Sequence, residues 1–263
     1  MNVIDFVVDG FKRFYTSENS GSKHVILFII SAIMSVFSTY IQLYPQTVGK
    51  TLNIESLGMV VIFSTIVFLL SLYMCGFIIK FNHNAFDDEN RSILPDFNFE
   101  PIKIFCKMLP VIFAWFFYLV IAIILLFLFC SVDKTCLVIG IILGTLLFIL
   151  YSFTGFITIA FAKNYKRDGL YNILLPLVYM NYAFGDVMLL AVLFMLMSGA
   201  ALSMCFMVGL AGGLNGLGAT PPKETLYVVG VLYGYFSLVL QMIWSYSLVQ
   251  IYKHKIEPKL NNY

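Results

Sequence analysis

The sequence predicts an all-α integral membrane protein with six transmembrane helices, and two observations carry this prediction. First, 60% of the 263 residues are apolar and only 11% are charged, with a net charge of +2. Soluble domains contain roughly 45–50% apolar and about 25% charged residues. Second, the chain contains six long stretches without a charged side chain. This composition excludes a soluble enzyme and a nucleic-acid binder, since too few charges are present to cover a water-facing surface or form a basic face.

The six uncharged stretches are continuously apolar, so they predict helices and not the alternating strands of a membrane barrel. Each is long enough for a helix to cross the bilayer, which takes about 20 residues. They comprise residues 24–49, 57–79, 108–130, 135–162, 187–222 and 225–252. The fifth ends in a glycine-rich segment closed by Pro221 and Pro222, which predicts that its helix stops near residue 211. We expect residues 1–263 to form a single membrane domain.

The cationic residues predict the orientation of the spans. Thirteen of the 16 Lys and Arg residues lie in the N-terminal segment, the second and fourth connections and the C-terminal segment. These four segments share one side of the membrane if the chain crosses six times. The positive-inside rule assigns that side to the cytoplasm. We therefore predict a multi-pass protein of the cell membrane with both termini in the cytoplasm.

Amphipathic segments on the cytoplasmic side are predicted to lie at the membrane interface. Residues 2–15 form one such segment, whose apolar face comprises Val3, Ile4, Val7, Phe11 and Phe14. This helix either rests in the headgroup layer or packs on the bundle. Residues 97–108 form a second segment, and residues 170–186 a weaker third. The basic residues expected to contact anionic lipids are Lys12, Arg13, Lys103 and Lys107.

A short motif suggests an internal repeat. The tripeptide Gly-Phe-Ile, beginning at Gly76 and again at Gly155, lies near the cytoplasmic ends of the second and fourth spans. The chain can then be divided into three units, each an interfacial helix followed by a two-span hairpin. The units comprise residues 1–80, 97–163 and 170–252. Repeats in membrane proteins often flank a substrate path, but they also occur in proteins that transport nothing.

The segment after the second span resembles a known family. Its marked residues are Gly76-Phe77, Lys80, Asn82, Asn84, Asp87-Asp88-Glu89 and Leu94-Pro95-Asp96-Phe97. This pattern is similar to the family called domain of unknown function 4013, with Phe77 standing where that family has Tyr. The resemblance implies a multi-pass prokaryotic membrane protein, and the family has no assigned activity.

The sequence carries no motif for catalysis. The six stretches contain no Asp, Glu, Lys or Arg. A charged side chain at mid-bilayer costs about 2.5–3.5 kcal/mol on insertion scales, so its presence there would indicate a use. Neither the zinc-protease pattern His-Glu-x-x-His nor the hydrolase pattern Gly-x-Ser-x-Gly occurs. We therefore expect no enzyme activity, no cofactor and no metal.

The spans carry hydroxyl and amide side chains. They are Ser31, Ser35, Ser38, Gln42, Ser64, Thr65, Ser71, Gln241, Ser245 and Ser247. These groups either form hydrogen bonds between helices or bind a neutral solute.

Pairs of glycines at a spacing of four indicate close helix packing. They are Gly140 and Gly144, Gly209 and Gly213, and Gly230 and Gly234. They serve either contacts among spans four, five and six or a seam between two copies of the chain. Cys130 and Cys136 flank a short outer loop, where a disulfide is geometrically possible.

Together these features favour a non-catalytic membrane protein: a scaffold, an accessory subunit or a lipid-associated factor. Its expected partners are membrane lipids, and a second membrane protein or a second copy of the chain is an open alternative. Nucleic acid is not an expected partner. The other functional hypothesis is a permease for a neutral or amphipathic solute, which would use the polar side chains of the spans.

Overall fold

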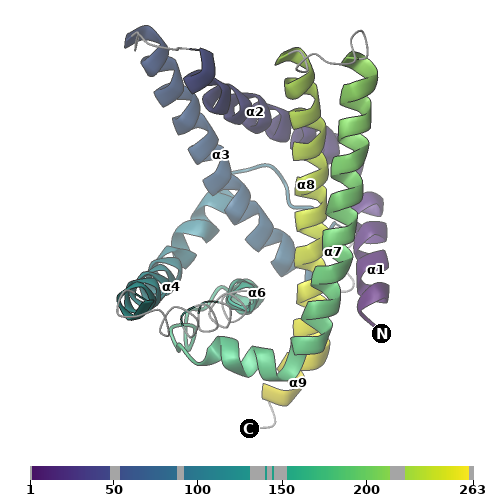
Figure 1. The fold of residues 1–263 in the computed structure, drawn as a ribbon. Coiled ribbons are helices and arrows are strands. Elements are labelled where there is room, and N and C mark those ends of the chain that lie inside the picture. The colour runs from purple at the N-terminus through teal and green to yellow at the C-terminus, as the bar shows by residue number, and fades with distance from the viewer. Residues whose placement is uncertain are drawn as a thin grey trace.

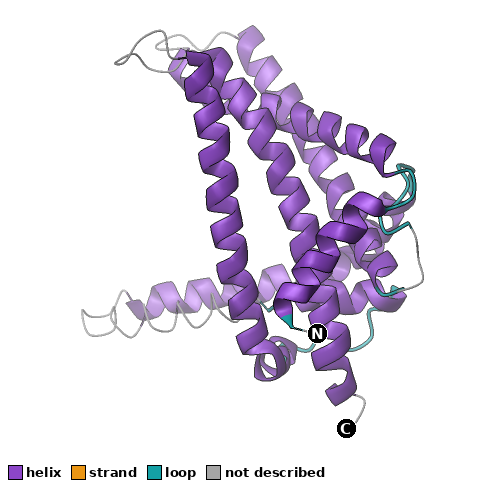
Figure 2. Cartoon of the chain, turned by 90° about the vertical axis from the view of Figure 1, so that its right-hand side faces the viewer, coloured by secondary structure: helices purple, strands orange, loops and turns teal. Residues whose placement is uncertain are grey.

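The structure is a computed structural model that describes residues 2–47, 54–87, 92–130, 140, 144, 153–213 and 223–260. Within these residues all regular secondary structure is helical (Figures 1 and 2). The helices are α1 (Val3–Thr16), α2 (Ser20–Thr47), α3 (Ile54–Ala85), α4 (Glu100–Cys130), α6 (Gly155–Asn164), α7 (Leu175–Gly213), α8 (Lys223–Ile251), the π-helix η1 (Tyr252–Ile256) and α9 (Glu257–Leu260).

Five segments of the described helices are long and apolar enough to cross a membrane. They are Ser20–Gln42, Leu57–Ala85, Glu100–Ile124, Leu175–Met207 and Thr225–Leu260. The protein is therefore an all-α, multi-pass membrane protein. The fourth expected span, residues 135–162, lies mostly outside the described residues, and α6 contains its end. Six crossings and the threefold repeat stay predictions.

The long helices are arranged around α8. Helices α7 and α8 form an antiparallel pair, α2 crosses α8, and α3 runs back from the far end of α2 (Figure 1). Helix α4 instead runs crosswise to the α7–α8 pair (Figures 1 and 2). Both chain termini lie in the lower half of Figure 1, whereas α2 and α7 end at the top. Which end faces the cytoplasm stays a prediction from the charges.

The two later interfacial segments are parts of long helices. The sequence predicts separate helices over residues 97–108 and 170–186. In the structure α4 begins at Glu100 and continues past residue 108, and α7 begins at Leu175 and continues past residue 186, without a break. Pro110 lies inside α4, although proline removes one backbone hydrogen bond of a helix. The first turns of α7 bend away from its long axis (Figure 1). The chain thus changes direction without ending the helix.

Helix α1 packs on the bundle with one face. Asn2 caps its start, because the Asn2 side chain accepts a hydrogen bond from the Asp5 N–H and the Asp5 carboxylate accepts one from the Asn2 N–H. The buried residues are Val3, Phe6, Val7, Gly10 and Phe14. The predicted face is therefore rotated, since Ile4 is exposed and Phe6 is buried.

Hydrogen bonds join the C-terminal ends of α3, α6 and α8, and we call their five side chains the end cluster. The cluster comprises Asn82, His83, Ser245, Gln250 and Lys253. Ser245 Oγ donates to Asn82 Oδ1 over 2.7 Å, and Asn82 is 1% exposed. His83 Nδ1 lies 2.7 Å from the Ala162 carbonyl oxygen near the end of α6. Helix ends leave carbonyl oxygens without helical partners, and these contacts supply partners.

The end of α3 receives two further donors from the C-terminal part of the chain. Gln250 Nε2 donates to the Ala85 carbonyl oxygen over 3.4 Å, and Lys253 Nζ donates to that of Phe86 over 3.3 Å. Tyr165 stacks on the His83 ring. Burial raises the pKa of the Tyr165 hydroxyl, and the negative charge of Glu100 raises it further, so this phenol stays neutral beside the cluster.

A buried lysine fixes the connection between α3 and α4. Lys23 Nζ donates to the Leu94 carbonyl oxygen over 2.7 Å and to Ser92 Oγ over 3.0 Å, and it pairs with the Asp96 carboxylate at 2.9 Å. The lysine is 7% exposed. This side chain therefore attaches the segment after α3 to the start of α2.

Gly76 allows α3 to approach the first turn of α4. A Cβ at this position would overlap the Pro101 carbonyl oxygen. We predict that Gly76→Ala destabilises the protein by about 1–3 kcal/mol, because backbone atoms must move to make room. Thermal unfolding of the purified protein in detergent measures the loss. Gly58→Ala, on the same helix with no described atom within 4 Å of the new methyl group, is the matched control and should leave stability within experimental error or raise it.

A second prediction concerns the Ser245–Asn82 hydrogen bond. Ser245→Ala removes the donor and leaves a buried amide oxygen without a partner, which costs about 1–3 kcal/mol. The neighbouring Ser247 donates only to the Ile243 carbonyl oxygen of its own helix, so Ser247→Ala should cost less. Equal melting temperatures of the two variants would contradict a stabilising role for the end cluster.

Candidate functional site

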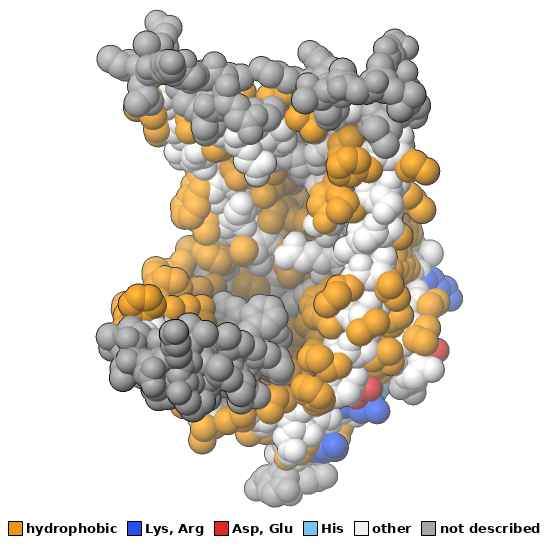
Figure 3. Space-filling view, in the orientation of Figure 1, with side chains coloured by type: hydrophobic (Ala, Val, Ile, Leu, Met, Phe, Trp, Pro, Cys, Tyr) orange, Lys and Arg blue, Asp and Glu red, His pale blue; other side chains and the backbone are white. Residues whose placement is uncertain are grey.

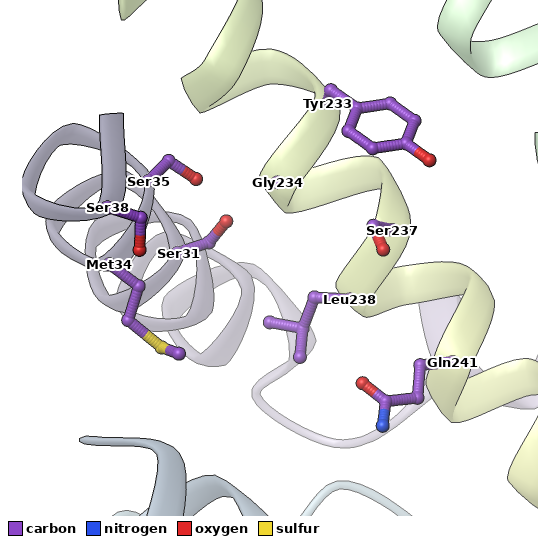
Figure 4. A pocket seen from close by; sticks show the side chains of 9 residues that line it. All are labelled: Ser31, Met34, Ser35, Ser38, Tyr233, Gly234, Ser237, Leu238 and Gln241. Atoms are coloured by element: carbon purple, nitrogen blue, oxygen red, sulfur yellow. The ribbon is translucent and has the colours of Figure 1, made fainter. Parts of the chain in front are cut away.

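The candidate site is a polar pocket between α2 and α8, which we call the α2–α8 pocket. It has a volume of about 290 Å³. It is lined by Ser31, Met34, Ser35, Ser38, Tyr233, Gly234, Ser237, Leu238 and Gln241 (Figure 4). None of these nine residues is charged. The pocket therefore offers hydroxyl, phenol and amide groups within two candidate membrane spans.

The sequence positions these groups through helical periodicity. Ser31, Ser35 and Ser38 recur at intervals of four and three along α2, so they share one face of the helix. The α8 lining follows the same rule, with Tyr233, Ser237 and Gln241 four residues apart. The crossing of α2 and α8 brings the two polar stripes together.

Gly234 makes the close crossing of these helices possible. A Cβ at Gly234 would overlap Ser35 Oγ and would lie 3.1 Å from Ser31 Oγ. One turn away, a Cβ at Gly230 would lie 3.2 Å from Thr39 Oγ1. The two α8 glycines therefore face hydroxyl side chains of α2, whereas the sequence analysis weighed contacts among spans four, five and six.

The pocket is closed at one end and open at the other. Ser31 is 5% exposed, whereas Ser237 and Gln241 are exposed. Both exposed residues lie in the candidate span Thr225–Leu260, so we expect the open side of the pocket to lie within the membrane. Figure 3 shows a hollow in one face of the molecule, with hydrophobic side chains at its border.

Ser31 has an unusual hydroxyl. Its Oγ atom is buried and has no hydrogen-bond partner among the described residues. Other hydroxyls of the spans donate to the carbonyl oxygen one turn earlier: Thr65 to Val61, Ser71 to Val67 and Ser247 to Ile243. An unpartnered buried hydroxyl is unfavourable, and here it borders a cavity.

The pocket can bind an uncharged polar group, but its lining has no histidine or carboxylate to act as a general base. Within the described residues, no group of three or more His, Cys, Asp or Glu side chains is placed to hold a metal ion. Hydrogen bonding is therefore the chemistry that this site offers.

The structure distributes the ten predicted polar side chains over several environments. Ser31, Ser35, Ser38 and Gln241 line the pocket together. Ser245 belongs to the end cluster, and Gln42 and Ser64 are exposed. Tyr233 and Ser237 were not among the predicted polar side chains, although they precede Gln241 at intervals of four residues along one face of α8.

Four of the predicted packing glycines and the predicted disulfide lie wholly or partly beyond what the structure describes. Gly140 and Gly144 stand between segments outside the described residues. The surroundings of Gly209 and Gly213, at the end of α7, also lie outside them. Cys130 is the last residue of α4, whereas Cys136 lies outside the described residues. Their roles stay predictions.

The four basic residues predicted to contact lipid lie on two helices. Lys12 of α1 and Lys103 and Lys107 of α4 are exposed. Arg13 differs, because its Nε lies 3.2 Å from the Asp9 carboxylate. Among the described residues, Lys12, Lys103 and Lys107 form no ion pair, so these three ammonium groups are available to an anion.

A second cavity, of about 400 Å³, lies at the turn between α6 and α7. Its lining includes Lys163, which pairs with Glu257, and Lys166, which has Asp168 two residues away. The lining thus contains side chains of both charge signs.

Comparison with known proteins adds no family to this description. The chain matches no protein-family profile, no curated protein and no solved structure. The functional argument therefore rests on the residues and their geometry.

Proposed function

We propose that the protein is a non-catalytic membrane protein that associates with anionic lipids and acts as a scaffold, an accessory subunit or a lipid-associated factor. The observation that supports the proposal is that α1 carries apolar side chains both on its buried face and on its exposed face. One face is buried on the bundle, and the opposite side exposes Ile4, Val8 and Tyr15. These three recur at intervals of four and seven residues, beside the exposed ammonium group of Lys12.

Such a helix suits the boundary between hydrocarbon and headgroups. Its outer apolar stripe favours immersion, and a nearby lysine attracts anionic phosphate. The packing of α1 on α8 then holds the basic residue at a fixed place on the protein.

The start of α4 repeats this combination of side chains. Phe99 and Ile102 are exposed next to Lys103, and Lys107 follows one turn later. We infer that α1 and α4 both contact anionic lipids of the cytoplasmic leaflet. A partner protein or a second copy of the chain would bind at the same lipid-facing surfaces. The resemblance to domain of unknown function 4013 is part of the proposal and supplies no activity.

The lipid contacts give a prediction about stability. The protein in phosphatidylcholine nanodiscs should be stabilised by added phosphatidylglycerol, and Lys12→Gln/Lys103→Gln/Lys107→Gln should lose most of this gain. The expected loss is about 1 kcal/mol for each cation near the surface. Thermal unfolding at both lipid compositions measures it.

Arg13→Gln is the control for this experiment. Its guanidinium group already pairs with Asp9, so its removal should reduce the phosphatidylglycerol effect less than removal of any one lysine. A triple-lysine variant that keeps the full stabilisation by phosphatidylglycerol would refute the proposed lipid contacts.

The α2–α8 pocket favours a second candidate, a permease for a neutral or amphipathic solute. In that case the polar pocket would be the solute site within the membrane. Reconstituted protein should then accelerate release of an uncharged solute from liposomes, and Ser38→Leu, which puts an apolar side chain into the pocket lining, should abolish the acceleration. The same release rate with and without protein, over a panel of neutral sugars and polyols, would exclude this role for the tested solutes.

A further inference from the structure

We infer that the α2–α8 pocket binds an uncharged, lipid-soluble molecule that carries at least two hydroxyl or amide groups. This inference does not depend on the anionic-lipid contacts proposed for α1 and α4, and it holds whether or not the molecule is transported. It rests on an unpartnered hydroxyl, an uncharged lining and an opening toward the membrane.

The unpartnered hydroxyl points to a ligand. Ser31 Oγ is buried within a candidate span and has no partner among the described residues. Figure 4 shows Ser31 and Ser35 on the side of α2 that faces α8, with Gly234 opposite. In hydrocarbon a polar group without a partner is costly. A hydrogen-bonding ligand in the pocket would satisfy this group.

Comparison with other serines shows that the Ser31 hydroxyl lacks the partner that a helical serine usually finds. A serine in a helix can donate to the carbonyl oxygen four residues earlier, as Ser71 and Ser203 do. Ser31 could donate to a carbonyl oxygen of α2 in the same way, but its hydroxyl forms no such hydrogen bond. Its Oγ instead lies in the narrow space beside Gly234.

The lining determines the charge of the ligand. Four serines, a tyrosine and a glutamine supply donors and acceptors, and no lining residue supplies a charge. A charged ligand at this depth would require a counter-ion that the pocket lacks. The groups come from two helices, so a ligand with two polar groups can bridge α2 and α8.

The size and the open side of the pocket indicate how large the polar part of the ligand is and where an apolar tail would lie. A volume of about 290 Å³ lies at the lower end of the roughly 300–1,000 Å³ typical of small-molecule sites. The pocket therefore accommodates a compact polar group. Ser237 and Gln241 are exposed at its open side, and both lie within the candidate span Thr225–Leu260. An attached apolar tail would leave through this opening into the lipid.

Photolabelling tests the inference with a monoacylglycerol that carries a diazirine in its acyl chain. The full-length protein is placed in phosphatidylcholine nanodiscs, irradiated and digested, and the labelled peptides are identified by mass spectrometry. We expect labelling of α2 and α8 peptides at the pocket, and competition by 1-monooleoylglycerol. Methyl oleate, which has the same tail without hydroxyls, should not compete, and glycerol, which has no tail, should require far higher concentrations.

Matched serine variants complete the test. Ser31→Ala/Ser35→Ala should weaken competition by 1-monooleoylglycerol about tenfold, since two hydrogen-bonding groups are lost. Ser203→Ala should leave it unchanged, because Ser203 donates within its own helix. Size-exclusion chromatography checks that each variant is folded, and the competition in the wild-type protein stands without any variant.

Three results would overturn the inference. Equal competition by methyl oleate would show that the hydroxyls are not recognised, and equal competition by glycerol would show that the tail is not. Labelling spread evenly over the lipid-facing helices, without competition at the pocket, would show that the cavity holds no such ligand.

Discussion

The hydrogen bonds among the C-terminal ends of α3, α6 and α8 are the constraint on which the rest of the structure depends. A buried carbonyl oxygen without a partner is not hydrated, and leaving such a polar group unpaired costs about 1–3 kcal/mol. The protein meets this requirement by letting side chains of one helix cap the end of another. Gln250 donates to the carbonyl oxygen of Ala85, the last residue of α3, and Lys253 to that of the next residue, Phe86. His83 contacts a carbonyl oxygen near the end of α6. The cap of one helix therefore fixes the position of its neighbour.

Helix α8 connects the end cluster to the rest of the molecule, because each of its faces packs against a different helix. The Tyr246 hydroxyl donates a hydrogen bond to the Asp9 carboxylate of α1. The Tyr246 ring also packs so closely on Gly10 of α1 that a side chain at position 10 would overlap it. Trp244 meets Phe194 of α7 edge-to-face, with ring centroids 5.1 Å apart. Gly234 turns toward α2. Once the end cluster sets the position of α8, these side chains set the places of α1, α7 and α2.

The parts of this arrangement that follow from one-dimensional patterns could be predicted from the sequence. Uncharged stretches revealed the spans because hydrocarbon excludes charge, and the end of α7 at Gly213 lies close to the predicted residue 211. Periodicity also predicted a helix at residues 2–15, but it placed Ile4 instead of Phe6 on the buried face. The apolar residues of α1 extend around most of its circumference, so the pattern alone does not decide which part of it packs.

The features that depend on a partner could not be read from the sequence. Lys23 is buried because Leu94 and Asp96, about 70 residues away along the chain, supply its oxygen partners, whereas general rules place lysine at the surface. In the same way, the serine stripe of α2 was visible as a pattern, but periodicity does not say which helix faces it. The glycines at 230 and 234 were recognised as packing residues, and only the three-dimensional structure identifies α2 as the neighbour.

The five side chains of the end cluster and the Ser31 side chain of the α2–α8 pocket differ in their hydrogen bonding, although the Tyr165 hydroxyl beside the end cluster also has no partner among the described residues. In the end cluster, donors and acceptors of different helices meet one another, so the polar groups contribute to holding the helices together. At the α2–α8 pocket the helices approach closely at Gly234, yet the buried Ser31 hydroxyl next to this contact finds no acceptor. Had the serines of α2 served only to join the helices, the simplest arrangement would pair them with Ser237 or Gln241 across the interface. The structure instead leaves a cavity between the two stripes. A ligand with two polar groups, bound in this cavity, would give the Ser31 hydroxyl a partner and would join the two stripes.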